Sequence, residues 1–382
     1  MFKTSRLSAV ATALVAVALT SATAHAAAPH RSDARTATAV PGVSVSGGRL
    51  LLNGTPTVFN GINAYNATTY WNVNFGCGSQ LTNPDALFNS VPSGSLVRTW
   101  AFQALGFNKF THKTDFTAID RVVNAAQAHG DYLVFALSDQ SGNCDDGHWH
   151  DQAWYDGGYN STYNDNGRGF SLSMSYFNWV KAVVTRYASN PTVAIYEPVN
   201  EPEASNCNTG FLGSGCYGHN TCPSGAGTSL RSFFDVVGGA IKSIDQRAIV
   251  STGTLGGNQC GVAGSAYSTI NASSAVDVAT YHDYNSPTVA LPAALSTRAD
   301  QTNALGKVFL VEESGISGST AGIGCPNLTD RATQFEAKMS AAKSVGSDAY
   351  LPWNWASGPS STCSLTVAPG DPVLTSMSTG NG

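Results

Sequence analysis

Charged side chains are scarce in this sequence. Asp, Glu, Lys and Arg make up 12% of its 382 residues, against about 25% in average soluble proteins. The formal net charge is −5, and the basic residues are scattered without forming a stripe. Nucleic acid is therefore not an expected partner. A surface built mainly from Gly, Ser, Thr and Asn instead favours an uncharged ligand.

Long apolar stretches are missing too, except at the beginning of the chain. Residues 1–26 have a basic start, an apolar run over Leu7–Leu19 and small residues at Ala24 and Ala26, which is the pattern of a signal peptide. Residues 27–42 are rich in Ala, Thr and Ser, and we expect them to be a disordered mature N-terminus. No later stretch approaches the roughly 20 apolar residues of a membrane helix. These features predict a secreted, extracellular and soluble protein with no membrane partner, and we expect it to be a monomer.

Two spacings that would indicate other chemistry are absent. No C-x-x-C pair occurs, so neither a cysteine-ligated zinc nor a redox site is expected. No G-x-S-x-G sequence occurs, which disfavours a Ser-His-Asp hydrolase. In an exported chain, an even number of cysteines predicts up to four disulfides, with the pairing left open. The eight cysteines are Cys77, Cys144, Cys207, Cys216, Cys222, Cys260, Cys325 and Cys363.

Eight strand-like apolar runs alternate with helical patterns. The runs are Val58–Asn63, Leu96–Trp100, Tyr132–Leu137, Val193–Val199, Ile249–Thr252, Val276–Tyr281, Val308–Val311 and Ala349–Trp353. Helical periodicity is clearest in Phe116–His129, Ser173–Arg186, Leu230–Ile244 and Asp330–Val345, the last opened by Thr329-Asp330 as a cap. Because parallel strands need crossover helices, this alternation predicts a single α/β domain over residues 43–382, a (β/α)8 TIM barrel. An open doubly wound sheet is the alternative.

Two glutamates follow predicted strands about a hundred residues apart. Glu201 lies in Asn200-Glu201-Pro202 after the fourth run, and Glu313 lies in Glu312-Glu313-Ser314-Gly315 after the seventh. Because the strand ends of a parallel barrel meet at one rim, we expect the two carboxylates to face each other. Such a pair suits glycosidic bond hydrolysis, in which one acid protonates the leaving oxygen and the other attacks or activates water. For an isolated Asn-Glu-Pro, a surface turn would be the simpler interpretation.

The chain resembles the glycoside hydrolase family 5 enzymes of the large retaining clan, most closely the fungal and plant type endo-β-1,4-mannanases. The resemblance runs from about Leu51 to Trp355. It rests on Leu52-Asn53-Gly54-Thr55-Pro56, Asn60-Gly61-Ile62-Asn63-Ala64-Tyr65, Val97-Arg98-Thr99-Trp100-Ala101-Phe102, Glu197-Pro198-Val199-Asn200-Glu201-Pro202, His282-Asp283-Tyr284 and Glu312-Glu313-Ser314-Gly315.

This resemblance implies a general acid/base, Glu201, and a nucleophile, Glu313. The preceding Glu312 is the rival nucleophile, because neighbouring strand residues point to opposite sides and only one can face the barrel mouth. Glu197 lies inside the fourth run, where a carboxylate must be paired, so it is interpreted as structural support.

The resemblance also implies polar side chains that bind the substrate. Arg98 would hydrogen-bond the nucleophile and keep it ionised, and Tyr284 would donate to the same carboxylate. Asn200 would hold the 2-hydroxyl of the sugar, and His282 would line the sugar subsite. The competing interpretations are a surface arginine at a strand end, a turn-forming asparagine and a buried, satisfied histidine.

Aromatic side chains complete the predicted cleft. Trp353, after the eighth run, is expected to give a sugar ring an apolar face, with Trp355 packing behind it. Trp100 and Trp149 could extend the cleft, but core packing explains either as well.

One loop and one short segment stand apart from the family pattern. The loop holds Asp145, Asp146, His148 and His150, a composition that could bind a cation, although carbohydrate contacts explain it equally. We expect no metal and no cofactor. Ser138-Asp139-Gln140 stand where the family often has paired asparagines with a tryptophan, and this departure bears on the substrate rather than on the reaction.

The sequence thus predicts a secreted retaining endo-β-1,4-mannanase that hydrolyses mannan-type polysaccharides with two glutamates. A β-glucanase or another β-glycan hydrolase on the same barrel is the nearest alternative, since one fold hosts many specificities. A non-catalytic carbohydrate-binding barrel is a further alternative, but binding alone needs no acid/base pair.

Overall fold

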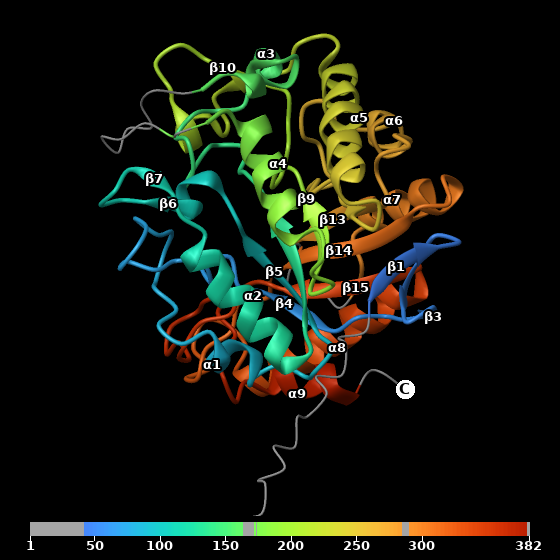
Figure 1. The fold of residues 1–382 in the computed structure, drawn as a ribbon. Coiled ribbons are helices and arrows are strands. Elements are labelled where there is room, and N and C mark those ends of the chain that lie inside the picture. Colours follow the sequence, from blue (N-terminus) through green and yellow to red (C-terminus); the bar gives the residue numbers. More distant parts are fainter. Residues whose placement is uncertain (1–41, 163–171, 173, 285–289, 380–382) are drawn as a thin grey trace, which may run out of the picture. The chain divides into compact units, whose positions relative to one another are not determined.

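The computed structural model describes residues 42–162, 172, 174–284 and 290–379, which all belong to a compact unit extending from Val40 to Gly382. The predicted signal peptide, and all but one residue of the predicted disordered N-terminus, lie outside the described residues. Eight parallel strands form the centre of this unit (Figure 1). They are β4 (Gly61–Asn63), β5 (Leu96–Trp100), β8 (Tyr132–Ala136), β9 (Val193–Glu197), β12 (Ile249–Val250), β13 (Val278–Asp283), β14 (Val308–Ser314) and β15 (Ser347–Pro352).

The eight strands close into a barrel. Five of them form one sheet in the order β12-β9-β8-β5-β4, and β13-β14-β15 form a second. Single parallel bridges join the two sheets at both edges, between Phe59 and Ala349 and between Ser251 and Val278. The predicted (β/α)8 barrel is therefore confirmed, and the open doubly wound sheet is wrong because the first and last strands are neighbours.

Helices follow the strands and cover the outside of the barrel, as α2, α4 and α5 do in Figure 1. Their inward faces are apolar at helical spacing, as with Leu230, Phe233, Phe234 and Val237, which are all fully buried. Within the described part of the chain, no helix combines the length and the apolar character needed to cross a bilayer. The helices after the eight strands are α1 (Asp85–Phe88), α2 (Thr117–His129), α4 (Tyr176–Tyr187), α5 (Ala226–Ile244), α6 (Ala266–Asn271), α7 (Ala293–Ala304), α8 (Leu328–Ser344) and α9 (Pro372–Thr379).

The start of α8 differs from the sequence prediction. Asn327 is the N-cap, and its side chain accepts a hydrogen bond from the backbone N–H of Asp330. The predicted cap at Thr329-Asp330 is wrong because Asn is as good a capping residue as Asp, and Asn327 lies two residues before Thr329.

An N-terminal antiparallel sheet, which the sequence prediction missed, closes the barrel at the strand starts. It consists of β1 (Val43–Ser46), β2 (Arg49–Leu52) and β3 (Thr55–Pro56). Leu50 is fully buried in a cluster with Val278 and Val308, the first residues of β13 and β14. Its backbone N–H donates to Asp348 at 2.6 Å. This sheet does not cover the opposite end of the barrel, where the strands finish.

Short elements and four disulfides organise the loops after the strands. All eight cysteines are paired, which confirms the predicted number of disulfides and supplies their pairing. Three disulfides link loops that follow different strands, so these loops have covalent support where they have little apolar core. The pairs are Cys77–Cys144, Cys207–Cys216, Cys222–Cys260 and Cys325–Cys363. The short elements are α3 (Gln152–Tyr155), η1 (Gln103–Gly106), η2 (Gly158–Asn160), η3 (Gly213–Cys216), β6 (Phe107–Asn108), β7 (Lys113–Thr114), β10 (Asn206–Cys207) and β11 (Asn220–Thr221).

Candidate active site

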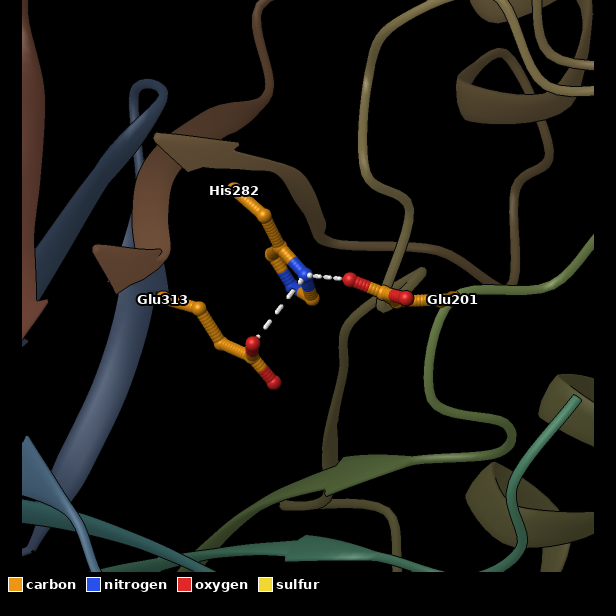
Figure 2. A group of neighbouring side chains, drawn as sticks. All are labelled: Glu201, His282 and Glu313. Carbon is orange, nitrogen blue, oxygen red and sulfur yellow. Dashed lines mark hydrogen bonds and ion pairs between the residues drawn. The ribbon is translucent and has the colours of Figure 1, made fainter. Parts of the chain in front are cut away.

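Two carboxylates face each other across the open end of the barrel. Glu201 follows β9 and Glu313 lies in β14, and Figure 2 shows both side chains directed at the ring of His282. One oxygen of each carboxylate and one ring nitrogen of the histidine all lie within 4.8 Å of one another. Glu313 is buried, whereas the Glu201 side chain is 23% exposed. The more accessible acid is thus the one that can exchange protons with solvent.

The backbone of Glu201 is held in an unusual conformation. Its φ is 52°, in the left-handed region that non-glycine residues rarely adopt. The N–H of Glu201 donates to the carbonyl of Gly253 at 2.9 Å, and its own carbonyl accepts from the Gln259 side chain at 3.2 Å. Gly253 must be glycine, because a Cβ there would lie 2.3 Å from the Val199 carbonyl oxygen. The loop after β12, which contains Gly253 and Gln259, therefore fixes the direction of the Glu201 side chain.

Both oxygens of Glu313 accept hydrogen bonds. Arg98 Nη1 donates to Oε1 at 2.5 Å and the Tyr284 hydroxyl donates to Oε2 at 2.6 Å. Burial and the adjacent Glu313 carboxylate raise the pKa of Tyr284, so its hydroxyl keeps its proton and remains a donor. A cation and a neutral donor together stabilise an ionised carboxylate, which is the state that a nucleophile needs.

Arg98 is the hub of the site. Its guanidinium is fully buried at the end of β5 and uses all five of its N–H groups. Nε and Nη2 donate to the two oxygens of Glu197 at 2.7 Å each, and Nη2 also donates to Asn200 Oδ1 at 2.6 Å. Nη1 donates to Asn63 and to Glu313. Glu197, interpreted from the sequence as support, thus orients the arginine that contacts Glu313.

His282 lies between the two acids. Its Nδ1 is 2.8 Å from Glu201 Oε1 and 3.6 Å from Glu313 Oε2. Burial alone would lower the pKa of His282, but the Glu313 and Glu201 carboxylates outweigh burial and raise the pKa above its ordinary value. The sequence placed this histidine in the sugar subsite, and the structure adds direct contact with Glu201.

Glu312 and Glu313 have different surroundings. The register of β13 against β14 shifts at this point, since Tyr281 pairs with Val311 and His282 with Glu313. Glu312 is fully buried, and burial together with the Glu197 carboxylate raises the pKa of Glu312 well above its usual range. The structure therefore places Glu313, and not Glu312, opposite Glu201.

Aromatic rings border the site on the side of β4 and β15. The Trp353 ring stacks on Tyr65 at 5.0 Å, and Trp100 packs against Tyr65 at 4.9 Å. Trp100 is 7% exposed and also stacks on Phe102, so it is mainly a packing residue of this cluster. Trp355 is buried, in keeping with the packing position expected for it. The sequence analysis did not single out Tyr65 as a site residue, although it lies two residues after β4.

Each of the four residues that the sequence singled out for a possible cation has a hydrogen-bond partner within the protein. His150 Nε2 is 3.2 Å from Asp146 Oδ2, and Asp145 accepts from the Ser138 hydroxyl at 2.8 Å. His148 Nδ1 contacts the Asp146 carbonyl at 2.8 Å. The hydrogen bonds within this loop explain its composition.

Among the described residues, the three potential metal ligands that do converge are Glu201, His282 and Glu313. Arg98 and Tyr284 also bind this group, each donating to one oxygen of Glu313.

Tyr217 is a second aromatic residue that the sequence interpretation overlooked. It lies in the loop between Cys207 and Cys222, with its ring edge-on to Trp149 at 5.0 Å. Burial and the carboxylates of Asp139 and Glu201 raise the pKa of Tyr217. No local sequence pattern indicates a site residue here, because Tyr217 lies in an irregular loop that the Cys207–Cys216 and Cys222–Cys260 disulfides hold.

A closed (β/α)8 barrel with a close carboxylate pair at the strand ends, one of them held by a buried arginine, defines a glycoside hydrolase. The chain belongs to glycoside hydrolase family 5. A family model described as "Cellulase (glycosyl hydrolase family 5)" matches residues 97–359, which is more than half of the chain.

Its relatives by sequence are described as mannanases. A rice (Oryza sativa subsp. japonica) mannan endo-1,4-beta-mannosidase 4 is 27% identical over 273 residues, covering 63% of this chain and 54% of the relative. A probable mannan endo-1,4-beta-mannosidase A of Aspergillus oryzae is 24% identical over 278 residues, covering 64% and 61%. The chain thus spans about half the length of the first relatives that it matches.

Solved structures show the same fold. An endo-1,4-beta-mannanase from Rhizomucor miehei superposes with a TM-score of 0.61 at 21% identity, covering 88% of this chain and 96% of the other. At that identity the match supports the shared barrel fold alone.

Proposed function

We propose that the protein is a secreted, retaining endo-β-1,4-mannanase. The observation that carries the proposal is the approach of Glu201 and Glu313 to within 4.8 Å, with Arg98 and Tyr284 bound to Glu313. Retaining glycosidases have carboxyl groups about 5–5.5 Å apart, whereas inverting enzymes leave about 6.5–9.5 Å for a water molecule. The relatives described as mannanases support the choice of substrate. The four disulfides, and the signal-like residues 1–26, support export.

Under this proposal each acid has its own role. The Glu313 carboxylate attacks the anomeric carbon, while Glu201 donates its proton to the glycosidic oxygen as that bond breaks. Glu201, now a carboxylate, then removes a proton from water, which displaces Glu313 and releases the sugar. His282 contacts Glu201 and holds its carboxyl group in place for both steps. Asn200, Trp353 and Tyr65 would bind the sugar beside Glu313.

Mannan is expected to be the preferred polysaccharide. We expect kcat/KM on β-1,4-mannan to exceed that on β-1,4-glucan by at least about tenfold, because a site that binds an axial 2-hydroxyl leaves polar groups unpaired when the epimer enters. The measurement is reducing-end release from mannan, glucomannan, cellulose, xylan and galactan, with the Glu313→Ala protein as the blank. The description of the family model as a cellulase favours a β-glucanase as the second candidate. Equal or greater activity on glucan would establish that candidate.

Hydrolysis is expected to retain the anomeric configuration. The short separation of Glu201 and Glu313 leaves no room for a water molecule between Glu313 and the sugar. Proton NMR of a mannooligosaccharide digest should show the β-anomer of the new reducing end first, followed by slow mutarotation. Initial appearance of the α-anomer would require an inverting mechanism and would contradict the nucleophilic role of Glu313.

A further inference from the structure

A buried carboxylate that the family resemblance does not explain lies next to Asn200. Asp139 follows β8, is 5% exposed, and forms a parallel bridge with Asn200. The backbone of Asn200 donates to the Ser138 carbonyl at 2.8 Å, and Gln140 N–H donates to the Asn200 carbonyl at 3.1 Å. These backbone bonds set the two side chains beside each other at the end of neighbouring strands.

Groups of opposite charge hold the Asn200 amide at its two ends. Its Oδ1 accepts from Arg98 Nη2 at 2.6 Å, and its Nδ2 donates to Asp139 Oδ1 at 2.8 Å. A flipped amide would set its NH2 group against the arginine N–H and its oxygen against the carboxylate. Because both contacts would then be repulsive, a single orientation is stable. One N–H of the amide is used by Asp139, which leaves the other to donate elsewhere.

A carboxylate satisfies every donor around Asp139. Oδ1 accepts from Asn200, while Oδ2 accepts from both the backbone N–H and the hydroxyl of Ser141. Both oxygens must therefore be acceptors. An asparagine at this position has one acceptor and one donor, so it would lose the bond either to Asn200 or to the Ser141 backbone.

We propose that Asp139 is a positioning residue that aims the second N–H of Asn200 at the 2-hydroxyl of the sugar next to Glu313, and so sets how strongly that hydroxyl is recognised. The inference rests on the proposed function, in which Asn200 binds this hydroxyl. It gives a role in substrate choice to Ser138-Asp139-Gln140, the segment that differs from the family pattern.

The test compares a substrate with and without the hydroxyl in question. An aryl β-mannotrioside and its analogue lacking the 2-hydroxyl on the sugar that bears the aryl group are hydrolysed by the wild-type and Asp139→Asn proteins. We expect the substitution to lower kcat/KM on the complete substrate by about tenfold or more, mainly through kcat, because the bond to the 2-hydroxyl strengthens in the transition state. On the deoxy analogue the change should stay below about threefold.

Asp145→Asn is the matched control. Asp145 is a buried carboxylate of the same loop, and its hydrogen bonds come from the Ser138 hydroxyl and the Ala104 N–H rather than from Asn200. It should change both substrates equally, and thermal unfolding should show whether either variant is destabilised.

Equal losses for Asp139→Asn on both substrates would overturn the positioning role. If the wild-type protein cleaves only the corresponding glucoside pair, the mannanase proposal fails, and the same comparison on that pair decides the role of Asp139. A wild-type protein that cleaves neither pair overturns both.

Discussion

Replacement of Glu313 by alanine is expected to abolish hydrolysis of every substrate, by at least about four orders of magnitude in kcat/KM. The variant lacks the group that forms the covalent intermediate, so even an aryl glycoside with a good leaving group should not react. Glu201→Ala should behave differently, because a leaving group that needs no proton bypasses the missing acid. It should retain turnover of the activated aryl substrate, and azide should accelerate it by replacing water at the second step.

Glu312→Gln is the matched control for this experiment. Glu312 is next in sequence to Glu313 and fully buried, and burial together with the Glu197 carboxylate raises its pKa. A glutamine amide resembles the protonated acid that this shift favours in size and charge. The activity of Glu312→Gln should stay within about tenfold of wild type. Inactivation at Glu312 with activity preserved at Glu313 would move the nucleophile by one residue, and azide rescue confined to the Glu313 variant would exchange the two roles.

The barrel was predictable because each strand carries its own signal. Apolar runs such as Leu96–Trp100 coincide with a strand, and the helix predicted over Phe116–His129 differs from α2 by one residue. Buried parallel strands are apolar on both faces, so they stand out against the polar loops around them. The N-terminal sheet was missed since β1 and β2 are only four residues each, and β1 exposes alternate positions.

The location of the candidate site was also predictable, but its internal contacts were not. Polar residues at strand ends pointed to Glu201 and Glu313, since the strand ends of a barrel share one rim. The sequence could not show that Arg98 binds Glu197 and Glu313 at once, because those partners are 99 and 215 residues away. Nor could it show the left-handed φ of Glu201, which depends on Gly253 in another loop.

Loss of the Arg98 side chain should destabilise the fold as well as abolish the reaction. Arg98→Met removes the cation from a fully buried group of carboxylates that includes Glu197 and Glu313, and leaves them without their main donor. Breaking a buried ion pair by removing one partner typically costs about 3–5 kcal/mol. We expect a reduction of that size in the free energy of unfolding, measured from the shift of the urea denaturation midpoint.

Two further variants separate stability from catalysis. Arg331 on α8 is also buried and pairs with Asp371, outside the candidate active site. Arg331→Met should therefore destabilise the protein to a similar degree while the folded fraction keeps its activity. Folded Arg98→Met should be inactive, because Glu313 loses the donor that stabilises its charge. Adding Glu197→Gln to Arg98→Met should recover part of the stability by removing one unpaired carboxylate, and no activity. An unchanged midpoint for Arg98→Met would mean that the carboxylates find other partners, and the hub role of Arg98 would be wrong.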